Sequence, residues 1–358
     1  MSTVQTEREM ELQSEVADLV QELQLRVRRV RGETSDPDIQ TFREEFRNQT
    51  PEELFARLRN SETALYGEGD IHEVSGLPPV APAQPAPRQP MVEPVLDNET
   101  LQRRNAASVV ALIPKGEIPQ DPASTRFTLT VQSAETFHDL CADEQFAKQL
   151  VARCIGSGFL VGLQTVATAF HCVDRNQILM DPADLRFVFG FEQQPGGSAQ
   201  TGFGPDDVYA FDSIIAHDPG PHADWALVKL DRPVNGRRPL ECRATGAISV
   251  GTGVYVIGHP LGLAKKLADG ANVRQASLPS AFFANLDVYG GNSGSPVFNA
   301  SDHRVEGILI AGEVSFLPCP SCNPPCNRSL PCPDNGCSGE EVVRILEVLA
   351  NHPLTGLP

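Results

Sequence analysis

Residues 290–298 read GGNSGSPVF, a glycine-rich turn that leads into an apolar run. Two earlier stretches also carry a polar residue at the edge of an apolar run, namely TAFHC at 168–172 and DWALVKLD at 224–231. In chain order the three stretches contribute a histidine, an aspartate and a serine. These side chains, when a fold brings them together, are the parts of a nucleophilic catalytic site.

The roles of the three side chains follow from their chemistry. A serine hydroxyl is a weak nucleophile at neutral pH, so Ser293 needs an adjacent base and a third group that orients the base. His171 can accept the hydroxyl proton and return it, because the ordinary pKa of an imidazole is near ~6.5. Asp224 would hold the imidazole in one tautomer and stabilise its charged form. The neighbouring glycines allow a tight turn, so we expect the amides of Gly291 and Ser293 to form an oxyanion hole.

Each motif alone also has a structural interpretation. A histidine after an apolar run is usually a buried core residue, DWALV is an ordinary buried strand, and GNSGSP is a common turn. The order His, Asp, Ser across the three motifs favours the catalytic interpretation.

Seven short stretches extend these motifs along the chain: CIGSGFLVG from residue 154, ATAFHCV from 167, RFVFGF from 186, DWALVKLDRPV from 224, VIGHPLGL from 256, ANLDVYGGNSGSPVFN from 284 and VEGILIAGE from 305. By these stretches, residues 105–345 resemble the bacterial trypsin-like serine peptidases of the chymotrypsin superfamily, nearest to the glutamyl endopeptidase branch. The resemblance implies a mainly β fold of two six-stranded antiparallel barrels, with the three side chains in the cleft between them. It also implies a serine endopeptidase that forms an acyl-enzyme intermediate, acts on protein or peptide substrates, and uses no cofactor or metal.

The pattern of apolar runs supports this fold without the resemblance. Runs such as GFLVGLQTVATAF, VYVIGHP and GILIAGE are short, rich in Val, Ile and Phe, and bounded by Gly, Pro or Asp. Few helical periodicities occur between residues 107 and 312, which argues against an α/β-hydrolase, where the nucleophile lies in GxSxG. Here Asn292 precedes the serine. In digestive trypsins, a carboxylate at this position captures the newly cut amino terminus during activation. A neutral amide cannot hold an ammonium group in that way, so we expect this chain to be active without that step.

Substrate preference is less determined than catalysis. Asp287 lies six residues before Ser293, which resembles the carboxylate at the floor of the trypsin pocket and favours Lys or Arg before the cut bond. The same residue is equally consistent with a buried, hydrogen-bonded structural acid. Glutamyl-specific relatives use a His on the strand facing the pocket, and the stretch GILIAGE offers none. Ala311 and Gly312, at the end of that stretch, are expected to bind substrate, and both preferences stay open.

The first part of the chain has a different composition. Apolar residues recur at helical spacing and a capping-box pattern begins at Thr50, so residues 1–75 are predicted to be α-helical. Residues 76–95 are rich in Pro and Ala and are predicted to be a linker. The helical region would be an interaction module for a protein partner, a propeptide, or a solvated appendage. The protease domain is predicted at 96–350, with a cysteine-rich loop at 319–337.

Nine cysteines bear on the compartment and on the structure of that loop. In the peptidases that this chain resembles, cysteines placed as Cys154 and Cys172 form a bridge that braces the histidine loop. Five more lie in the loop, whereas Cys141 and Cys242 stand apart. We expect disulfides or reduced thiols in the loop. Its motif CPSC is a weaker indication of a structural zinc site, because a second CxxC pair is missing.

The net charge of −17 argues against nucleic acid or an anionic membrane as the main partner. No apolar run is long enough to span a bilayer, and the first residues are too charged for a secretory signal. We therefore expect a cytoplasmic protein, with secretion as the alternative that the cysteines suggest. Two other functions stay open: a catalytically silent trypsin-like fold that serves as a protein-binding module, and a stress-type protease without its peptide-binding domain.

Overall fold

A computed structural model describes residues 53–54, 71–73 and 98–353, except 195–196, 287, 313–315, 320–321, 323 and 330–338. The chain divides into two compact units. The larger unit contains Ile71–Gln132, Gln149–Gly312 and Glu340–Pro358, and the smaller unit contains Met1–Asp70, Ser133–Lys148 and Glu313–Gly339. Of the predicted helical region 1–75, only two helical residues and one short strand are described, and the predicted linker lies outside the described residues.

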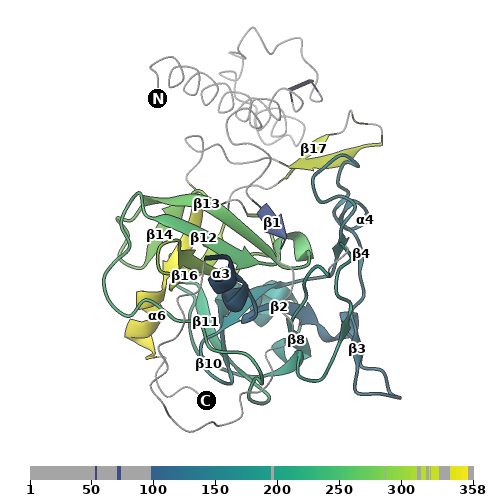
Figure 1. Ribbon diagram of the computed structural model, residues 1–358, viewed down its shortest axis with the longest axis horizontal. Helices are drawn as coiled ribbons and strands as arrows, with labels where there is room; N and C mark the ends of the chain where they lie inside the picture. Colours follow the sequence, from purple (N-terminus) through teal and green to yellow (C-terminus); the bar gives the residue numbers. More distant parts are fainter. Residues whose placement is uncertain are drawn as a thin grey trace. The chain divides into compact units, whose positions relative to one another are not determined.

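The first half of the larger unit is a closed antiparallel barrel with the strand order β10-β11-β7-β6-β2-β8. Its strands are rich in Val, Ala, Phe and Leu, and β2 and β7 are buried along their whole length. Figure 1 shows this barrel below the second one. Its strands are β2 (Val109–Pro114), β6 (Gly156–Leu160), β7 (Thr165–Ala169), β8 (Leu185–Phe189), β10 (Val208–Asp218) and β11 (Trp225–Leu230).

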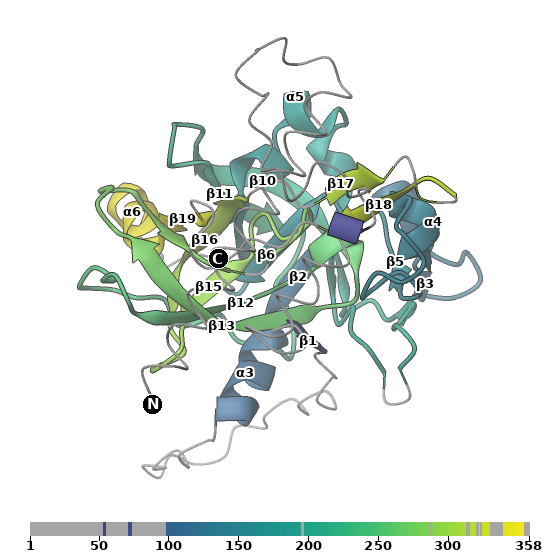
Figure 2. The same cartoon turned by 90° about the horizontal axis from the view of Figure 1, so that it is seen from above.

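The second barrel has the strand order β13-β12-β15-β16-β19-β14 and closes by the pairing of β13 with β14. The strand β1 (Ile71–Glu73) adds to its edge by pairing with β13. The other strands are β12 (Gly253–Gly258), β13 (Lys266–Gln275), β14 (Ala281–Ala284), β15 (Pro296–Asn299), β16 (Val305–Ala311) and β19 (Glu340–Arg344). The prediction of a mainly β fold with two six-stranded antiparallel barrels is confirmed (Figures 1 and 2).

The remaining elements are short and connect or cover the barrels. No helix among the described residues is both long enough and apolar enough to cross a membrane. In the larger unit these elements are α3 (Asn98–Ala106), η3 (Lys115–Glu117), β3 (Phe127–Thr128), β5 (Leu150–Val151), η4 (Phe170–Cys172), α5 (Arg175–Ile178), η5 (Pro182–Asp184), β9 (Gly202–Phe203), η6 (Pro260–Gly262) and α6 (Ile345–Asn351). The smaller unit contains α4 (Ala134–His138), β17 (Phe316–Cys319) and β18 (Cys326–Ser329), and β4 (Gln132–Ser133) ends where it begins.

One continuous apolar core joins the two barrels. It contains Phe159 and Trp225 of the first barrel and Tyr255 and Phe298 of the second, and all four side chains are almost fully buried. Burying an apolar side chain of this size stabilises the fold by about 1.5–3 kcal/mol. The barrels are therefore held together by the same kind of packing that holds each one closed.

A buried ion pair also links the two barrels. Lys265, just before β13, is fully buried, and its Nζ donates to Oε1 of Glu192 at 2.8 Å and to the carbonyl of Ala106 at 2.6 Å. Burial lowers the pKa of Lys265, and the carboxylate of Glu192 opposes that effect. Since Glu192 follows β8 of the first barrel and Lys265 precedes β13 of the second, this pair links one barrel to the other.

Candidate active site

Strand pairing brings His171 and Asp224 together. Ala169, the last residue of β7, lies opposite Trp225, the first residue of β11. The residues that extend the two strands therefore stay adjacent, and the amide of Phe170 donates to the carbonyl of Asp224 at 3.1 Å. The carboxylate of Asp224 accepts from the backbone N–H of His171 at 3.0 Å and contacts Nδ1 of its ring at 2.6 Å.

This contact determines which ring nitrogen of His171 carries a proton. A carboxylate only accepts hydrogen bonds, so Nδ1 donates to Asp224 and Nε2 of the neutral ring is the acceptor. Burial of the ring opposes its protonation, but the hydrogen bond with Asp224 and a contact with Cys172 outweigh burial and raise the pKa of His171 above its ordinary value. In this tautomer Nε2 of His171 carries the lone pair that can accept a proton.

Ser293 lies in the turn before β15, against the strand that neighbours the histidine loop. Its carbonyl accepts from the backbone N–H of Ser157 in β6 at 2.7 Å, and Sγ of Cys172 lies 3.7 Å from the same oxygen. Within the described residues, Nε2 of His171 and Oγ of Ser293 do not form a hydrogen bond. In unliganded hydrolases such bonds are often long and shorten when substrate binds.

Ser157 is a positioning residue that the sequence patterns did not single out. Its hydroxyl donates to the carbonyl of Gly291 at 2.8 Å and accepts from the backbone N–H of His259 at 3.0 Å. Its own carbonyl accepts from the hydroxyl of Thr168 at 2.6 Å. Hydrogen bonds therefore link the turn that carries Ser293 to β6 and β7, and β7 leads into the loop of His171. The only sequence signal for this role is a serine between two glycines in CIGSGFLVG.

The turn around Ser293 requires glycine at two positions. Gly291 has φ +97° and Gly294 has φ +89°. A Cβ at Gly291 would lie 2.6 Å from the carbonyl oxygen of His259, and one at Gly294 would lie 2.1 Å from that of Ser157. Both the backbone conformation and the available space therefore exclude a side chain.

Two amides in this turn have no acceptor. Among the described residues, the N–H groups of Gly291 and Ser293 donate to no protein atom, whereas the N–H of Gly294 donates to Leu309 at 2.7 Å and that of Ser295 to Asn292 at 2.9 Å. Unpaired amides on either side of a nucleophile are donors for a developing oxyanion.

The strand β16 runs past the same turn and ends in exposed residues. Leu309 accepts from Gly294 and donates to the carbonyl of Ser295 at 3.0 Å, and Ala311 and Gly312 follow at the surface. A Cβ on Gly312 would lie 2.3 Å from Oε2 of Glu340 and 3.5 Å from Cγ2 of Val288. The carboxyl group of Glu340 therefore occupies the position that a side chain at residue 312 would take, beside the end of the strand and the segment before Ser293.

Glu340 is a second residue that the sequence patterns missed. It begins β19 opposite Ala284 of β14 and is only 3% exposed. Buried acids are rare unless they are paired, and Glu340 does have an interaction within the protein. The signal was a Glu–Glu pair at the start of the apolar run EEVVRIL, but only the fold shows which of the two acids points inward.

Two sequence predictions near the serine, for Asp287 and Asn292, stay predictions. Asp287 lies outside the described residues, so its role stays a prediction. Asn292 is buried, and its side-chain oxygen accepts from the hydroxyl of Ser295 at 3.5 Å. The amide of Asn292 is thus part of the turn itself.

The implied bridge between Cys154 and Cys172 is wrong. Both are free thiols, as is Cys242. Sγ of Cys154 points to the carbonyl of Gly156 at 3.0 Å, whereas Sγ of Cys172 is directed toward the carbonyls of Ile155 and Ser293. Burial raises the pKa of Cys154 and of Cys242 to about 12, so both remain protonated thiols. Packing rather than a covalent link holds the histidine loop.

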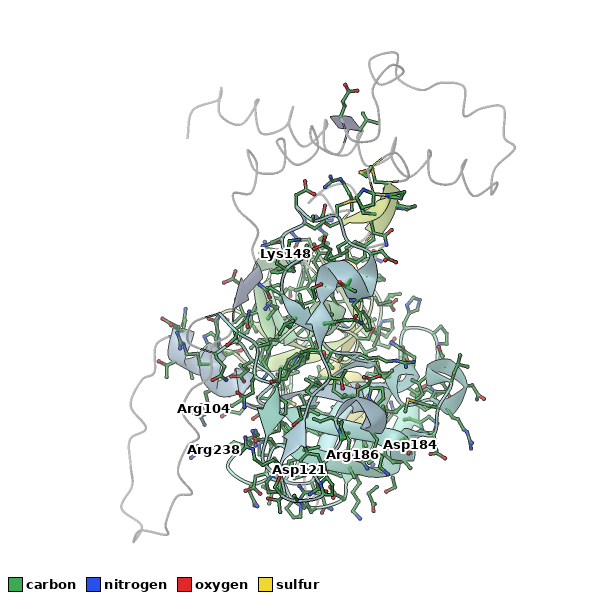
Figure 3. All side chains as sticks on the ribbon, turned by 90° about the vertical axis from the view of Figure 1, so that its right-hand side faces the viewer. Arg104, Asp121, Lys148, Asp184, Arg186 and Arg238 are labelled. Carbon is green, nitrogen blue, oxygen red and sulfur yellow. A yellow bond between two sulfur atoms is a disulfide. The ribbon has the colours of Figure 1, made fainter. Side chains whose placement is uncertain are left out.

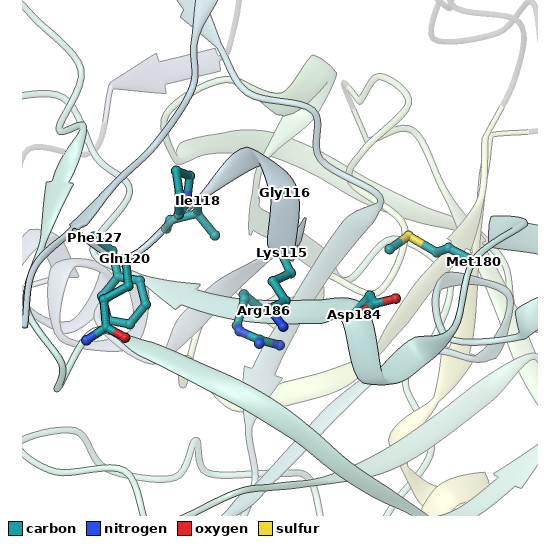
Figure 4. A pocket seen from close by; sticks show the side chains of 9 residues that line it. Lys115, Gly116, Ile118, Gln120, Phe127, Met180, Asp184 and Arg186 are labelled. Carbon is teal, nitrogen blue, oxygen red and sulfur yellow. The ribbon is translucent and has the colours of Figure 1, made fainter. Parts of the chain in front are cut away.

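A pocket of 570 Å³ lies elsewhere in the larger unit. Its lining includes Lys115, Phe127, Asp184 and Arg186, and none of the predicted site residues contributes to it. Figure 4 shows Phe127 at one end, Met180 at the other, and Lys115, Arg186 and Asp184 between them, and Figure 3 marks Asp184 and Arg186 close together. This pocket is separate from the residues around Ser293.

Residues 156–308 match the family described as trypsin-like peptidase domain. This part of the chain is therefore similar to a trypsin-like peptidase domain. The matched residues include the loop of His171, Asp224, Ser293 and most of β16. Peptidase domains of this family act on proteins or peptides. The match does not extend to the glutamyl endopeptidase branch, which is not confirmed.

No curated protein sequence matches the chain. Solved structures similar to the peptidase domain include human heparin binding protein, with 14% identity over 71% of this chain and 94% of that chain and a TM-score of 0.44. Neuropsin, a serine protease expressed in the limbic system of mouse brain, has 15% identity over 69% and 93% and a TM-score of 0.41. The VesB protease of Vibrio cholerae has 14% identity over 68% and 62% and a TM-score of 0.42. These values are too low to carry a functional argument.

Proposed function

We propose that this peptidase is a serine endopeptidase with Ser293 as nucleophile, His171 as general base and Asp224 as the group that orients the base. The observation that carries the proposal is the paired contact of one carboxylate with both the backbone N–H and Nδ1 of His171. It leaves Nε2 as the basic nitrogen, on a loop that touches the backbone of Ser293 through Cys172.

The proposed reaction has two halves. Oγ of Ser293 attacks the substrate carbonyl while its proton passes to Nε2 of His171, and Asp224 stabilises the imidazolium that forms. The carbonyl oxygen becomes negatively charged and is bound by the free N–H groups of Gly291 and Ser293. His171 then gives the proton to the leaving amine. Water hydrolyses the acyl-enzyme by the same steps in reverse, with His171 again as the base.

The carboxyl group of Glu340 is the proposed determinant of substrate preference. It packs against Gly312, at the end of the strand whose Leu309 is hydrogen-bonded to the turn that carries Ser293. A carboxylate at that place would attract a basic side chain and repel an acidic one. We therefore favour cleavage after Lys or Arg over cleavage after Glu, with Ala311 and Gly312 forming the exposed wall of the substrate site.

A peptide library tests both parts of this proposal. The full-length protein and its Ser293→Ala variant are incubated with a diverse set of peptides, and the cut positions are read by mass spectrometry. We expect cuts after Lys and Arg with the unchanged protein and none with the variant. Equal cutting by the variant would rule out Ser293 as nucleophile, and cuts after Glu would rule out the proposed role of Glu340.

The N-terminal region of residues 1–75 is proposed to recruit a protein partner. This proposal rests on its amphipathic sequence pattern. Because β1 (Ile71–Glu73) pairs with β13, a deletion should end before Ile71 and so spare the barrel edge. Loss of co-purifying proteins, with peptide cleavage unchanged, is expected on removal of residues 1–70. An unchanged set of co-purifying proteins and an unchanged oligomeric state would contradict it.

A further inference from the structure

Four cysteine sulfurs converge in the smaller unit. Cys141 is disulfide-bonded to Cys326, and Cys319 is disulfide-bonded to Cys322. Cys319 and Cys326 also lie directly opposite each other in the β17–β18 pair. The sulfurs of Cys141, Cys322 and Cys326 all lie within 4.8 Å of one another. The two disulfides are therefore neighbours, and together they form one cluster of sulfur atoms, which we call the four-cysteine cluster.

The dimensions of the cluster fit a tetrahedral metal ion. Zinc bonds thiolate sulfur at about 2.3 Å, which places the sulfurs of a tetrahedral site about 3.8 Å apart. Three of the four sulfurs already lie within 4.8 Å of one another, and the fourth is bonded to one of them. When the disulfides open, the sulfurs of each bonded pair need to separate from 2.11 Å and 2.23 Å to about 3.8 Å.

The backbone that carries the cysteines is fixed independently of the disulfides. The N–H of Cys141 donates to the carbonyl of Asn327 at 3.0 Å, and the N–H of Asn327 donates to the carbonyl of Asp139 at 2.6 Å. The side chain of Asn327 donates to the carbonyl of His138 at 2.9 Å. Figure 2 shows α4 beside β17 and β18. Cys141 thus stays next to β18 whether or not its sulfur is bonded.

An ion-pair cluster reinforces the same junction. Nη1 of Arg328 contacts Asp143 at 2.9 Å and Glu144 at 3.0 Å, and the side chain of Arg328 is only 12% exposed. The hydroxyl of Ser329 also donates to Glu144. These contacts lie just beyond Cys141 on one segment and just beyond Cys326 on the other, so they hold the two segments in register.

The ligand set explains why the sequence pattern is only a weak indication. CPSCNPPC supplies three cysteines, of which the first two have the CxxC spacing of many zinc sites, but no second CxxC pair follows. The fourth ligand, Cys141, precedes Cys326 by 185 residues. Two cysteines so far apart do not form a recognisable sequence motif, so only the fold shows that Cys141 lies beside the other three cysteines.

We propose that the four-cysteine cluster is a structural zinc site in the reduced protein, with Cys141, Cys319, Cys322 and Cys326 as ligands. A dithiol reductant supplies two electrons and two protons to each disulfide and is itself oxidised to a disulfide. One Zn²⁺ then binds the four sulfurs and displaces the four thiol protons. The disulfides are the oxidised form of the same site. In both forms the cluster ties the segment of Cys141 to the β17–β18 pair.

Cobalt binding tests the proposal directly. The full-length protein is purified without chelators, reduced with excess dithiol, supplied with Zn²⁺, and freed of dithiol and unbound metal under anaerobic conditions. We expect about one zinc per chain by elemental analysis. After zinc removal, Co²⁺ should give the thiolate charge-transfer band and the strong visible bands of a tetrahedral site with four sulfur ligands. Absence of both zinc and these bands would overturn the proposal.

Variants identify the ligands. Cys141→Ser and the double change Cys319→Ser with Cys322→Ser should each weaken cobalt binding at least about 100-fold. The matched control is the double change Cys332→Ser with Cys337→Ser in the same loop, outside the described residues, which should bind cobalt as the unchanged protein does. Loss of binding in this control together with its retention in Cys141→Ser would contradict the proposed ligand set.

A separate readout guards against misfolding. Trp225 is the sole tryptophan of the sequence and is buried in the core of the larger unit. Its fluorescence emission should remain that of a buried indole in every cysteine variant. A variant that loses both cobalt binding and buried emission is replaced by the single change Cys322→Ser, which retains three ligands and should shift the visible bands rather than remove them.

Discussion

At the scale of single residues, Asp224 determines how His171 is presented. Its two oxygens contact both the backbone and the ring of the same histidine, so the imidazole can neither rotate nor exchange its tautomer without losing a hydrogen bond. The sequence predicted this partnership from residue types and their order alone. It could not predict that the same contact, against the effect of burial, would raise the pKa of His171.

Replacement of Asp224 by Asn tests the orientation of His171. We expect kcat to fall on the order of 10⁴-fold, because an amide can hold the wrong tautomer. The general base must be neutral, so kcat/KM is lost as pH falls through the pKa of His171, and the raised pKa puts this acidic limb above ~6.5. In Asp224→Asn the negative charge that stabilises the protonated imidazole is lost. The pKa of His171 should therefore fall, and the acidic limb of kcat/KM should move to lower pH. A pH profile of kcat/KM checks this, and an unmoved limb would count against the assignment.

Replacement of Glu340 by Gln tests the proposed substrate preference. We expect kcat/KM for substrates with Lys or Arg before the cut bond to fall about 10–100-fold, since a charge-assisted contact is lost. Substrates with a neutral residue there should be little affected. Glu341→Gln is a matched control, because the neighbouring acid on β19 contacts His222 instead. Equal losses in the two variants, or a uniform loss over all substrates, would contradict the role of Glu340.

At the scale of elements, the strands were predictable and the links between distant segments were not. Apolar runs such as TVATA and GFLVG appear as β7 and β6, and the register of β7 with β11 brings His171 to Asp224. The partnership of Cys141 with the loop depends on hydrogen bonds of Asn327, which no sequence pattern expresses. The expected Cys154 bridge was wrong because each thiol turns to a backbone carbonyl instead.

Replacement of Gly291 by Ala tests the turn that carries Ser293. The new Cβ would lie 2.6 Å from the carbonyl of His259 at a φ of +97°, so the turn must move and misplace the Gly291 amide. Removing one oxyanion donor costs about 10²–10³-fold in kcat. Gly290→Ala is the control, since a Cβ there meets nothing within 4 Å. Steady-state kinetics should separate the two, and similar kcat values would contradict the proposed oxyanion hole.

At the scale of the whole molecule, the two barrels behave as one folded body because they share a core and a buried ion pair. The sequence predicted two barrels and the chain order of the site residues. It did not predict the contact of Lys265 with Glu192, because neither residue lies in a recognisable motif and each becomes buried only when the barrels meet.

Replacement of Glu192 by Gln tests the link between the barrels. Lys265 would then be a fully buried ammonium without a counter-charge, and the free energy of unfolding should fall by about 3–5 kcal/mol. Glu99→Gln breaks the exposed pair with Arg103 in α3 and should cost at most about 0.5 kcal/mol. Urea unfolding followed by Trp225 fluorescence measures both changes. Equal small effects would show that the buried pair does not stabilise the barrels.

The most direct test of the central claim is the site of reaction with a fluorophosphonate, read by mass spectrometry of the intact protein and its peptides. A serine hydroxyl reacts with such a probe at a useful rate only when an adjacent base activates it. We predict a single adduct that maps to Ser293, is absent from Ser293→Ala, and forms at least about 1,000-fold more slowly in His171→Ala. No adduct on Ser293, or labelling of His171→Ala at an undiminished rate, would contradict it.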